Sequence, residues 1–140
     1  MHASAALRTP HGRWLLRSTM SVVIELGSRA RPQPAPAHVV WQSLTQPHEP
    51  TARQWLDLLD DETDPQIVDR SEPILVVWSS LWPDLPEATI RFDIEPSGQG
   101  CHLRWTLLSP EPVPSDSKIG HMRFRLNVII NERLRRSYGQ

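Results

Sequence analysis

Cysteine is almost absent from this chain of 140 residues, in which Cys101 is the only one. A single cysteine excludes an intrachain disulfide and fits a reducing, cytoplasmic location. Excess charge of one sign is missing as well, since 15 basic and 16 acidic residues leave a formal net charge of −1. Such a chain has no general electrostatic attraction to nucleic acid or to an anionic membrane. No apolar run approaches the length of a membrane-spanning helix, so we expect no membrane insertion.

Motifs for catalysis and for cofactor binding are also lacking. The sequence contains no nucleophile elbow, no phosphate-binding glycine loop and no HExxH motif, and its histidines are not spaced as in a zinc site. A calcium loop of the EF-hand type that began at Asp60 would need glycine and glutamate where Pro65 and Ser71 stand. We therefore expect no cofactor and no metal, and a solvated loop for the acidic residues 60–64.

Proline and tryptophan, in contrast, are frequent: the chain has 14 prolines and six tryptophans. The prolines divide the chain into short elements, because proline ends helices and removes a backbone donor. The tryptophans provide large apolar surfaces from few positions. The start of the chain contains arginines but no acid, and Pro10 and Gly12 interrupt it. We predict a disordered N-terminal extension over residues 1–20 and one domain over residues 21–138.

The spacing of apolar residues predicts a strand, two short helices, several antiparallel strands and a long final helix. Thr51 is expected to cap the second helix, which would present Trp55, Leu58 and Leu59 on one apolar face. Ser115 or Ser117 is expected to cap the last helix. The predicted elements are a strand over 21–26, an extended connector over 30–37, helices over 36–44 and 52–59, strands over 65–73 and 74–81, a hairpin over 87–108 and a helix over 117–136.

The hairpin predicted over 87–108 alternates between apolar and polar residues. Alternation of this kind is typical of strands with one covered and one solvated face, and the apolar stripe of the final helix supplies the cover. On the polar face, Asp93 and Glu95 are expected to pair with Arg104 or to meet water. Cys101, at the start of the second strand, is expected to be a small core residue.

Arginines gather at the end of the final helix, at positions 133, 135 and 136. The helix dipole favours cations at a C-terminus, so we expect these side chains to stabilise the helix end and to be solvated. A basic binding patch is the alternative.

Several local patterns follow one another along the chain: Pro36-Ala37-x-x-Val40-Trp41-x-x-Leu44, then Trp55, then Ile90-x-Phe92-x-Ile94-x-Pro96-x-Gly98-x-Gly100, and the final helix. Together they resemble the START-like (SRPBCC) superfamily, the polyketide cyclase/dehydrase and lipid-transport group. The similarity extends over roughly Ser21 to Tyr138, and Cys101 departs from it, since threonine is common there. The resemblance implies an α+β helix-grip fold, in which a bent antiparallel sheet wraps around a long C-terminal helix, with two short helices between the first and second strands.

The resemblance also implies an apolar pocket between the sheet and the final helix. Apolar and aromatic lining with few polar groups is typical of small-molecule sites. The alternative for each of these side chains is a place in an ordinary core. The expected lining residues are Trp55, Trp78, Trp82, Ile90, Phe92, Leu103, Trp105, Met122, Leu126 and Ile129.

Three functions fit the sequence. The first is non-enzymatic binding of a hydrophobic small molecule of lipid, polyketide or aromatic type, by a monomer or homodimer. The second is a polyketide cyclase or dehydratase, for which His102 and His121 are the acid–base candidates. The third is a protein-interaction module, whose exposed apolar patch would include Trp82 or Trp14.

Overall fold

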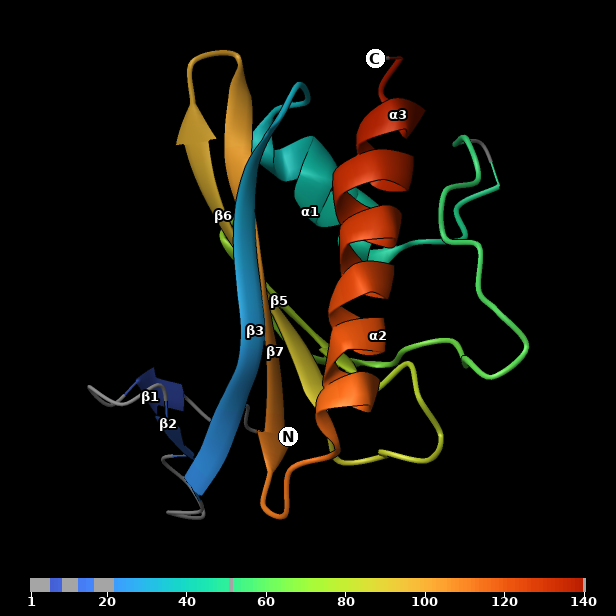
Figure 1. Ribbon diagram of the computed structural model, residues 1–140. Helices are drawn as coiled ribbons and strands as arrows, with labels where there is room; N and C mark the ends of the chain where they lie inside the picture. The colour runs from blue at the N-terminus through green and yellow to red at the C-terminus, as the bar shows by residue number, and fades with distance from the viewer. Residues whose placement is uncertain (1–5, 9–12, 17–21, 51, 140) are drawn as a thin grey trace.

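The computed structural model describes residues 6–8, 13–16, 22–50 and 52–139. One antiparallel sheet packs its inner face against one long helix, and α1 covers one end of the same face (Figure 1). The strand order is β1-β2-β3-β7-β6-β5-β4. This is the predicted helix-grip architecture. The strands are β1 (Ala6–Arg8), β2 (Arg13–Leu16), β3 (Val22–Gln33), β4 (Ile67–Ser71), β5 (Leu75–Ser79), β6 (Thr89–Ser97) and β7 (Gly100–Pro110).

The hairpin of β6 and β7 forms the centre of the sheet, as its alternating sequence predicts. Phe92 lies opposite Trp105 in the register, and both side chains are buried on the inner face. Gly98 turns the chain with a φ of 59°, a conformation that glycine adopts without a steric penalty. Gly100 is required for a different reason, because a Cβ at this position would collide with the backbone oxygen of Gln33.

The terminal helix runs from Asp116 to Ser137 as α2 (Asp116–Leu126), a π-helical stretch η1 (Asn127–Leu134) and α3 (Arg135–Ser137). Ser115 caps it, since its hydroxyl accepts a hydrogen bond from the Lys118 amide at 3.2 Å. The predicted apolar stripe faces the sheet. Its fully buried members are Met122, Leu126, Ile129, Ile130 and Leu134.

The first predicted helix is confirmed as α1 (Ala37–Thr45), which Pro36 precedes. Val40 and Leu44 are fully buried, and tryptophans of the sheet and the helix fasten α1 in place. The indole of Trp78 donates to the backbone oxygen of Leu44 at 2.8 Å, and that of Trp41 donates to the backbone oxygen of Leu75 at 3.0 Å. α1 therefore closes one end of the grip.

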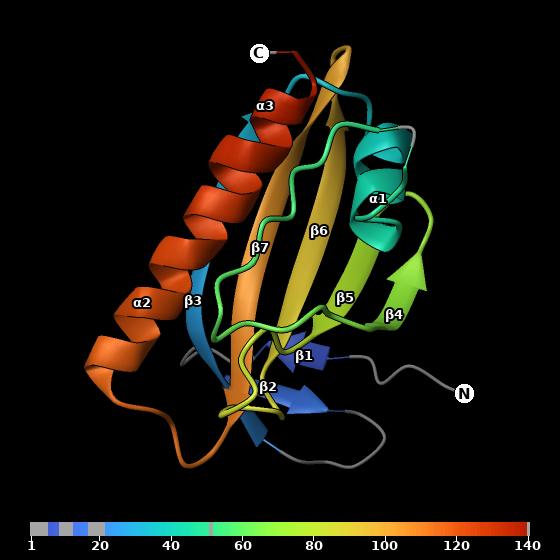
Figure 2. The same ribbon diagram turned by 90° about the vertical axis from the view of Figure 1, so that its right-hand side faces the viewer.

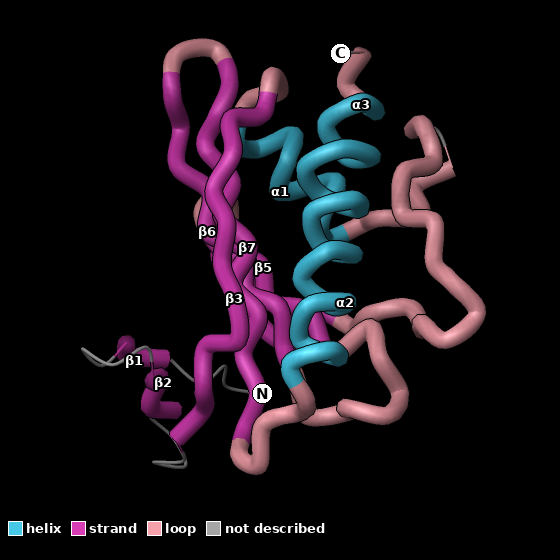
Figure 3. Tube along the Cα trace, viewed as in Figure 1, coloured by secondary structure: helices cyan, strands magenta, loops and turns pink. Residues whose placement is uncertain are grey.

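The second predicted helix, over 52–59, is wrong: residues 53–59 form no helix, and Thr51 lies outside the described residues. Figure 3 shows the stretch as a long loop. Side chains take up the backbone groups that helical hydrogen bonds would need. The carbonyl of Asp57 accepts from Arg125, and the amide of Leu59 donates to Glu62. Of the expected apolar face, Trp55 and Leu58 do pack in or against the core, whereas Leu59 is 45% exposed.

The first strand is longer than predicted, because β3 continues to Gln33 and includes half of the expected connector. Pro32 is tolerated there because this part of β3 pairs only with β7, so its missing N–H costs no ladder bond on the other side. At the opposite end, β2 pairs with β3 along Val22 to Ile24. β1 and β2 fall within the extension predicted to be disordered, whose remaining residues lie outside the described part of the chain.

Candidate functional site

The residues predicted to line a pocket all lie inside the grip, and each of them is at most 4% exposed. They belong to a single hydrophobic cluster that joins the sheet, the terminal helix and α1. An enclosed cavity lined by the whole set stays a prediction. The members of this set are Trp55, Trp78, Trp82, Ile90, Phe92, Leu103, Trp105, Met122, Leu126 and Ile129.

Aromatic rings link this cluster to the surface. Trp55 stacks on Trp78 with ring centroids 6.1 Å apart, and Trp78 meets Phe92 edge-on at 4.7 Å. The indole of Trp105 donates to the Asn127 side chain at 3.1 Å. Trp82 is fully buried and not part of a surface patch, which corrects its proposed role in an interaction module. The side chain of Trp14 lies outside the described residues.

A pocket of about 460 Å³ opens where α1, residues 46–49 and 52–55 and α3 meet, and we call it the end pocket. Figure 2 shows that the loop leading to β4 crosses between the terminal helix and α1, over the inner face of the sheet. Trp55 is the one member of the predicted set that lines this pocket, and the cluster lies behind it. The complete lining is Val39, Gln42, Ser43, Gln46, Glu49, Ala52, Arg53, Trp55, Ser137 and Tyr138.

Tyr138 forms the boundary between the end pocket and the core. Its hydroxyl donates a hydrogen bond to the Ser43 hydroxyl at 2.8 Å, which ties the end of the terminal helix to α1. Burial raises the pKa of Tyr138 to about 12, although the hydrogen bond with Ser43 opposes the shift. The phenol is therefore neutral at physiological pH, and because its proton is donated to Ser43, its oxygen can only accept a hydrogen bond from a ligand.

A buried ion pair holds the segment that carries Trp55. The Glu62 carboxylate accepts from Nε and Nη2 of Arg125 at 2.8 and 2.9 Å, and from the Leu59 amide at 2.9 Å. Exposure of the two side chains is 0% for Glu62 and 6% for Arg125. Burial alone would raise the pKa of Glu62, but the hydrogen bonds and the charge of Arg125 outweigh it and lower that pKa. The pair fastens this loop to α2.

This pair was not predicted, because residues 60–64 were expected to form a solvated loop. One feature of the sequence does indicate that Arg125 is buried. Arg125 lies three positions after Met122 and four before Ile129, so it shares the apolar stripe of the helix. A buried arginine needs an acidic partner, but the sequence does not say which acid that is.

Asp61, Glu62 and His121 place three potential metal ligands within 4.8 Å of one another. The guanidinium of Arg125, however, already binds both oxygens of Glu62. A cation at this position would meet that positive charge at close range. Glu62 is therefore occupied by the ion pair, and we do not assign the cluster as a metal centre.

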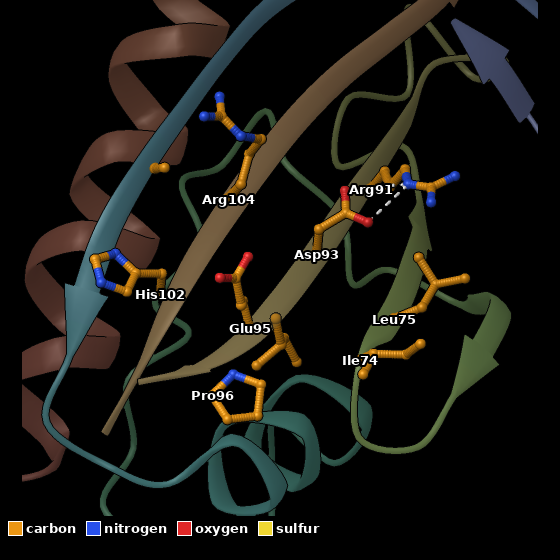
Figure 4. Close-up of a pocket in the computed structure, with 10 residues that line it drawn as sticks. Ile74, Leu75, Arg91, Asp93, Glu95, Pro96, His102 and Arg104 are labelled. Carbon is orange, nitrogen blue, oxygen red and sulfur yellow. Dashed lines mark hydrogen bonds and ion pairs between the residues drawn. The ribbon is translucent and has the colours of Figure 1, made fainter. Parts of the chain in front are cut away.

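A second pocket, of about 670 Å³, lies on the opposite, solvent-facing side of the sheet, and we call it the outer pocket. Figure 4 shows charged side chains of both signs projecting into it from β6 and β7. Arg91 binds Asp93 on its own strand at 3.1 Å, whereas Arg104 donates to Ser28 at 2.8 Å. The expected bond between Asp93 and Arg104 is replaced by these two, although the residues do lie opposite each other. A hydrophobic ligand here would have to displace water from these charges.

The remaining reactive candidates, His102 and Cys101, do not line the end pocket. His102 is exposed and lines the outer pocket, as its place on the polar face predicted. Cys101 is buried, which confirms its expected place in the core, and burial raises its pKa to about 11. A thiol with that pKa is protonated at neutral pH and is a poor nucleophile. Within the described residues, no helix has the length and apolar character needed to cross a membrane.

Comparison with solved structures supports the fold. CalU16 from Micromonospora echinospora superposes with a TM-score of 0.58 at 15% identity, over 93% of this chain and 81% of that protein. The Aha1 protein from Colwellia psychrerythraea, described as a dimer, gives 0.56 at 15% identity, over 77% and 91%. An AHSA1-like protein from Rhizobium etli gives 0.53 at 15% identity, over 81% and 80%.

Sequence comparison adds no closer relative: no family model matches the chain. No curated protein matches it either. The solved structures are START-like proteins, and the likeness to them lies in the arrangement of sheet and terminal helix. The chain therefore shares the helix-grip fold of these solved structures, the fold that its sequence patterns predicted.

Proposed function

We propose that the protein binds a hydrophobic small molecule, without transforming it, in the end pocket. The observation that carries the proposal is the position of Trp55, which faces this pocket and stacks on Trp78 of the core at 6.1 Å. Val39 and Tyr138 add apolar surface from two other elements. The volume of about 460 Å³ lies within the roughly 300–1,000 Å³ of typical small-molecule sites.

The polar groups of the pocket support an orienting role. Gln42 and Ser43 are consecutive residues in the last turn of α1, Gln46 is its C-cap residue, and all three line the pocket. A few hydrogen-bonding groups within an apolar wall fix the orientation of a ligand. The outer pocket is larger, but its charged lining makes it the poorer site for a hydrophobic compound.

The rest of the proposal follows the sequence. We propose a domain over residues 21–138, a monomeric or homodimeric state and a cytoplasmic location, with a lipid, polyketide or aromatic compound as the ligand class. The predicted residues behind Trp55 would support the binding wall through the stack with Trp78.

A pair of pocket-filling variants tests the site. Ala52 lines the end pocket and Ala30 lines the outer pocket, and both are exposed, so a tryptophan at either position fills one pocket without opening the core. We expect Ala52→Trp to abolish binding of the neutral probe N-phenyl-1-naphthylamine, followed by its fluorescence, and Ala30→Trp to leave it unchanged. Loss of binding in Ala30→Trp alone would move the site to the outer pocket, and no binding by the unaltered protein would reject the proposal.

Native mass spectrometry of the freshly purified protein provides the ligand class. We expect a non-covalent adduct of a few hundred daltons, on the order of what such a pocket volume holds. The adduct should be lost from Ala52→Trp and retained by Ala30→Trp.

A further inference from the structure

Three arginines surround a small recess beside the end pocket. The recess has a volume of about 180 Å³, and we call it the arginine pocket. It shares Arg53, Trp55 and Ser137 with the end pocket, so the two pockets adjoin. Its lining contains no acidic residue. The complete lining is Arg53, Gln54, Trp55, Arg133, Arg136 and Ser137.

Arg133 has unused hydrogen-bonding capacity in this pocket. Its Nε is buried and has no hydrogen-bond partner among the described residues. Its ion pair within the described residues, from Nη1 to the Asp57 carboxylate, is long at 3.4 Å, and the side chains of Arg133 and Asp57 are 41% and 72% exposed. A buried donor without a partner costs free energy, so an acceptor at this place would stabilise the protein.

The other two arginines of the pocket are also available. Arg53 and Arg136 are exposed, and within the described part of the chain neither side chain makes a hydrogen bond or an ion pair. Glu49, in the wall of the end pocket, is the nearest acidic lining residue and has an interaction of its own.

Neighbouring arginines on the same helix differ in this respect. Arg125 is satisfied by Glu62 and by the Asp57 carbonyl, and Arg135 donates to the backbone oxygen of Pro32 at 2.7 Å. Stabilisation of the helix end by its dipole applies to Arg135 and Arg136 alike. It does not account for a buried, unpartnered Nε at Arg133 or for the convergence of Arg53 from a different segment.

We propose that the arginine pocket binds the acidic group of an anionic amphiphile whose apolar part lies in the end pocket. The inference rests on the proposed function and specifies its ligand class. A guanidinium binds the oxygens of a carboxylate, sulfonate or phosphate through paired N–H donors, and such charge-assisted bonds are roughly twice as strong as neutral ones. Trp55 lies at the boundary and would contact both parts of the ligand.

The test compares two probes that share a ring system. N-Phenyl-1-naphthylamine is neutral, and 1-anilinonaphthalene-8-sulfonate carries a sulfonate. We expect the sulfonate to bind about tenfold more tightly at low ionic strength, and the difference to shrink as salt screens the arginines. Equal affinity, or tighter binding of the neutral probe, would overturn the inference and leave the proposed function intact. Absence of binding by both probes would reject the proposed function itself.

Arginine variants locate the contact. We expect Arg133→Gln to weaken sulfonate binding about tenfold, and Arg53→Gln and Arg136→Gln about threefold each, with the neutral probe unchanged. Arg29→Gln is the matched control, because Arg29 is an exposed arginine on β3 that lines neither pocket. Arg133→Lys keeps the charge without the fork of donors and serves if Arg133→Gln unfolds. Equal losses in Arg29→Gln would show non-specific attraction and overturn the assignment.

Discussion

Replacing Glu62 by glutamine removes the charge of the one buried acid that faces Arg125. The side chain of Arg125 is only 6% exposed, so water cannot replace the lost carboxylate. Breaking a buried ion pair on one side typically costs about 3–5 kcal/mol, because the remaining charge is uncompensated. We expect Glu62→Gln to lower the free energy of unfolding by about 3 kcal/mol and the melting temperature by about 10 °C.

A double-mutant cycle separates the interaction energy between Glu62 and Arg125 from the contributions of the other groups that each of them contacts. In Glu62→Leu/Arg125→Met no buried charge remains, but the Leu59 amide and the Asp57 carbonyl lose their side-chain partners. At about 1 kcal/mol for each lost hydrogen bond, the double variant should be destabilised by about 2 kcal/mol, less than either single variant. The assay is urea unfolding followed by tryptophan fluorescence, with the slope of the transition as a check on two-state behaviour.

The dependence of the free energy of unfolding on pH is an independent test of the ion pair. The pKa of Glu62 is lower in the folded protein than its ordinary value of 4.5, so the folded state favours the ionised form. The stabilisation is complete above the unfolded pKa and is lost as the pH falls through the folded pKa. Between pH 7 and pH 3 the unaltered protein should therefore lose more stability than Glu62→Gln. The buried pair would be refuted if each single variant lowered the free energy of unfolding by less than about 1 kcal/mol and the double variant lowered it by the sum of the two.

Three further predictions follow from the packing around the hairpin and the helix end. Gly100→Ala should destabilise the protein by about 2 kcal/mol in urea unfolding, since its Cβ would collide with the backbone of Gln33, and a neutral effect would contradict that approach. Cys101, with a pKa of about 11, should react with a disulfide reagent at pH 8 only after unfolding, and rapid labelling of the folded protein would contradict its burial. Tyr138, the single tyrosine, should titrate by absorbance near 12, with stability lost as the pH rises from 10 through 12, and Ser43→Ala should raise that pKa further. Titration near 10 would show an exposed phenol.

The hairpin and the terminal helix were predictable because their signals are local. Alternation along 90–94 and 103–107 places Phe92 and Trp105 on one face whatever the rest of the chain does. The helical stripe from Met122 onward has the same property. The cap of the terminal helix was predicted to be Ser115 or Ser117, and Ser115 is the residue that caps it.

The second helix was not predictable, because distant groups decide against it. Trp55 and Leu59 have helical spacing, but Arg125 takes the Asp57 carbonyl across 68 positions of sequence and Glu62 takes the Leu59 amide. A local pattern cannot include a partner of that kind, and tertiary contacts override weak helix propensity.

The candidate site was predictable only in part, for the same reason. Apolar spacing identifies side chains that leave water, but it does not separate those that fill a core from those that line a pocket. Trp55 lines the end pocket, and the other predicted members lie in the packed cluster. Arg53 and Arg133 come together from segments 80 positions apart, so their convergence appears only in the folded chain.

The end pocket is tested most directly as the binding site by a ¹⁵N–¹H spectrum of the tryptophan indoles during titration with N-phenyl-1-naphthylamine. Trp55 lines the end pocket, whereas the indoles of Trp78 and Trp105 are held by Leu44 and Asn127 inside the grip. We predict that the Trp55 indole signal shifts and saturates with the probe, and that the Trp105 signal stays in place. A large shift at Trp105 with Trp55 unmoved would put the ligand in the core between sheet and helix and contradict the end pocket as the binding site.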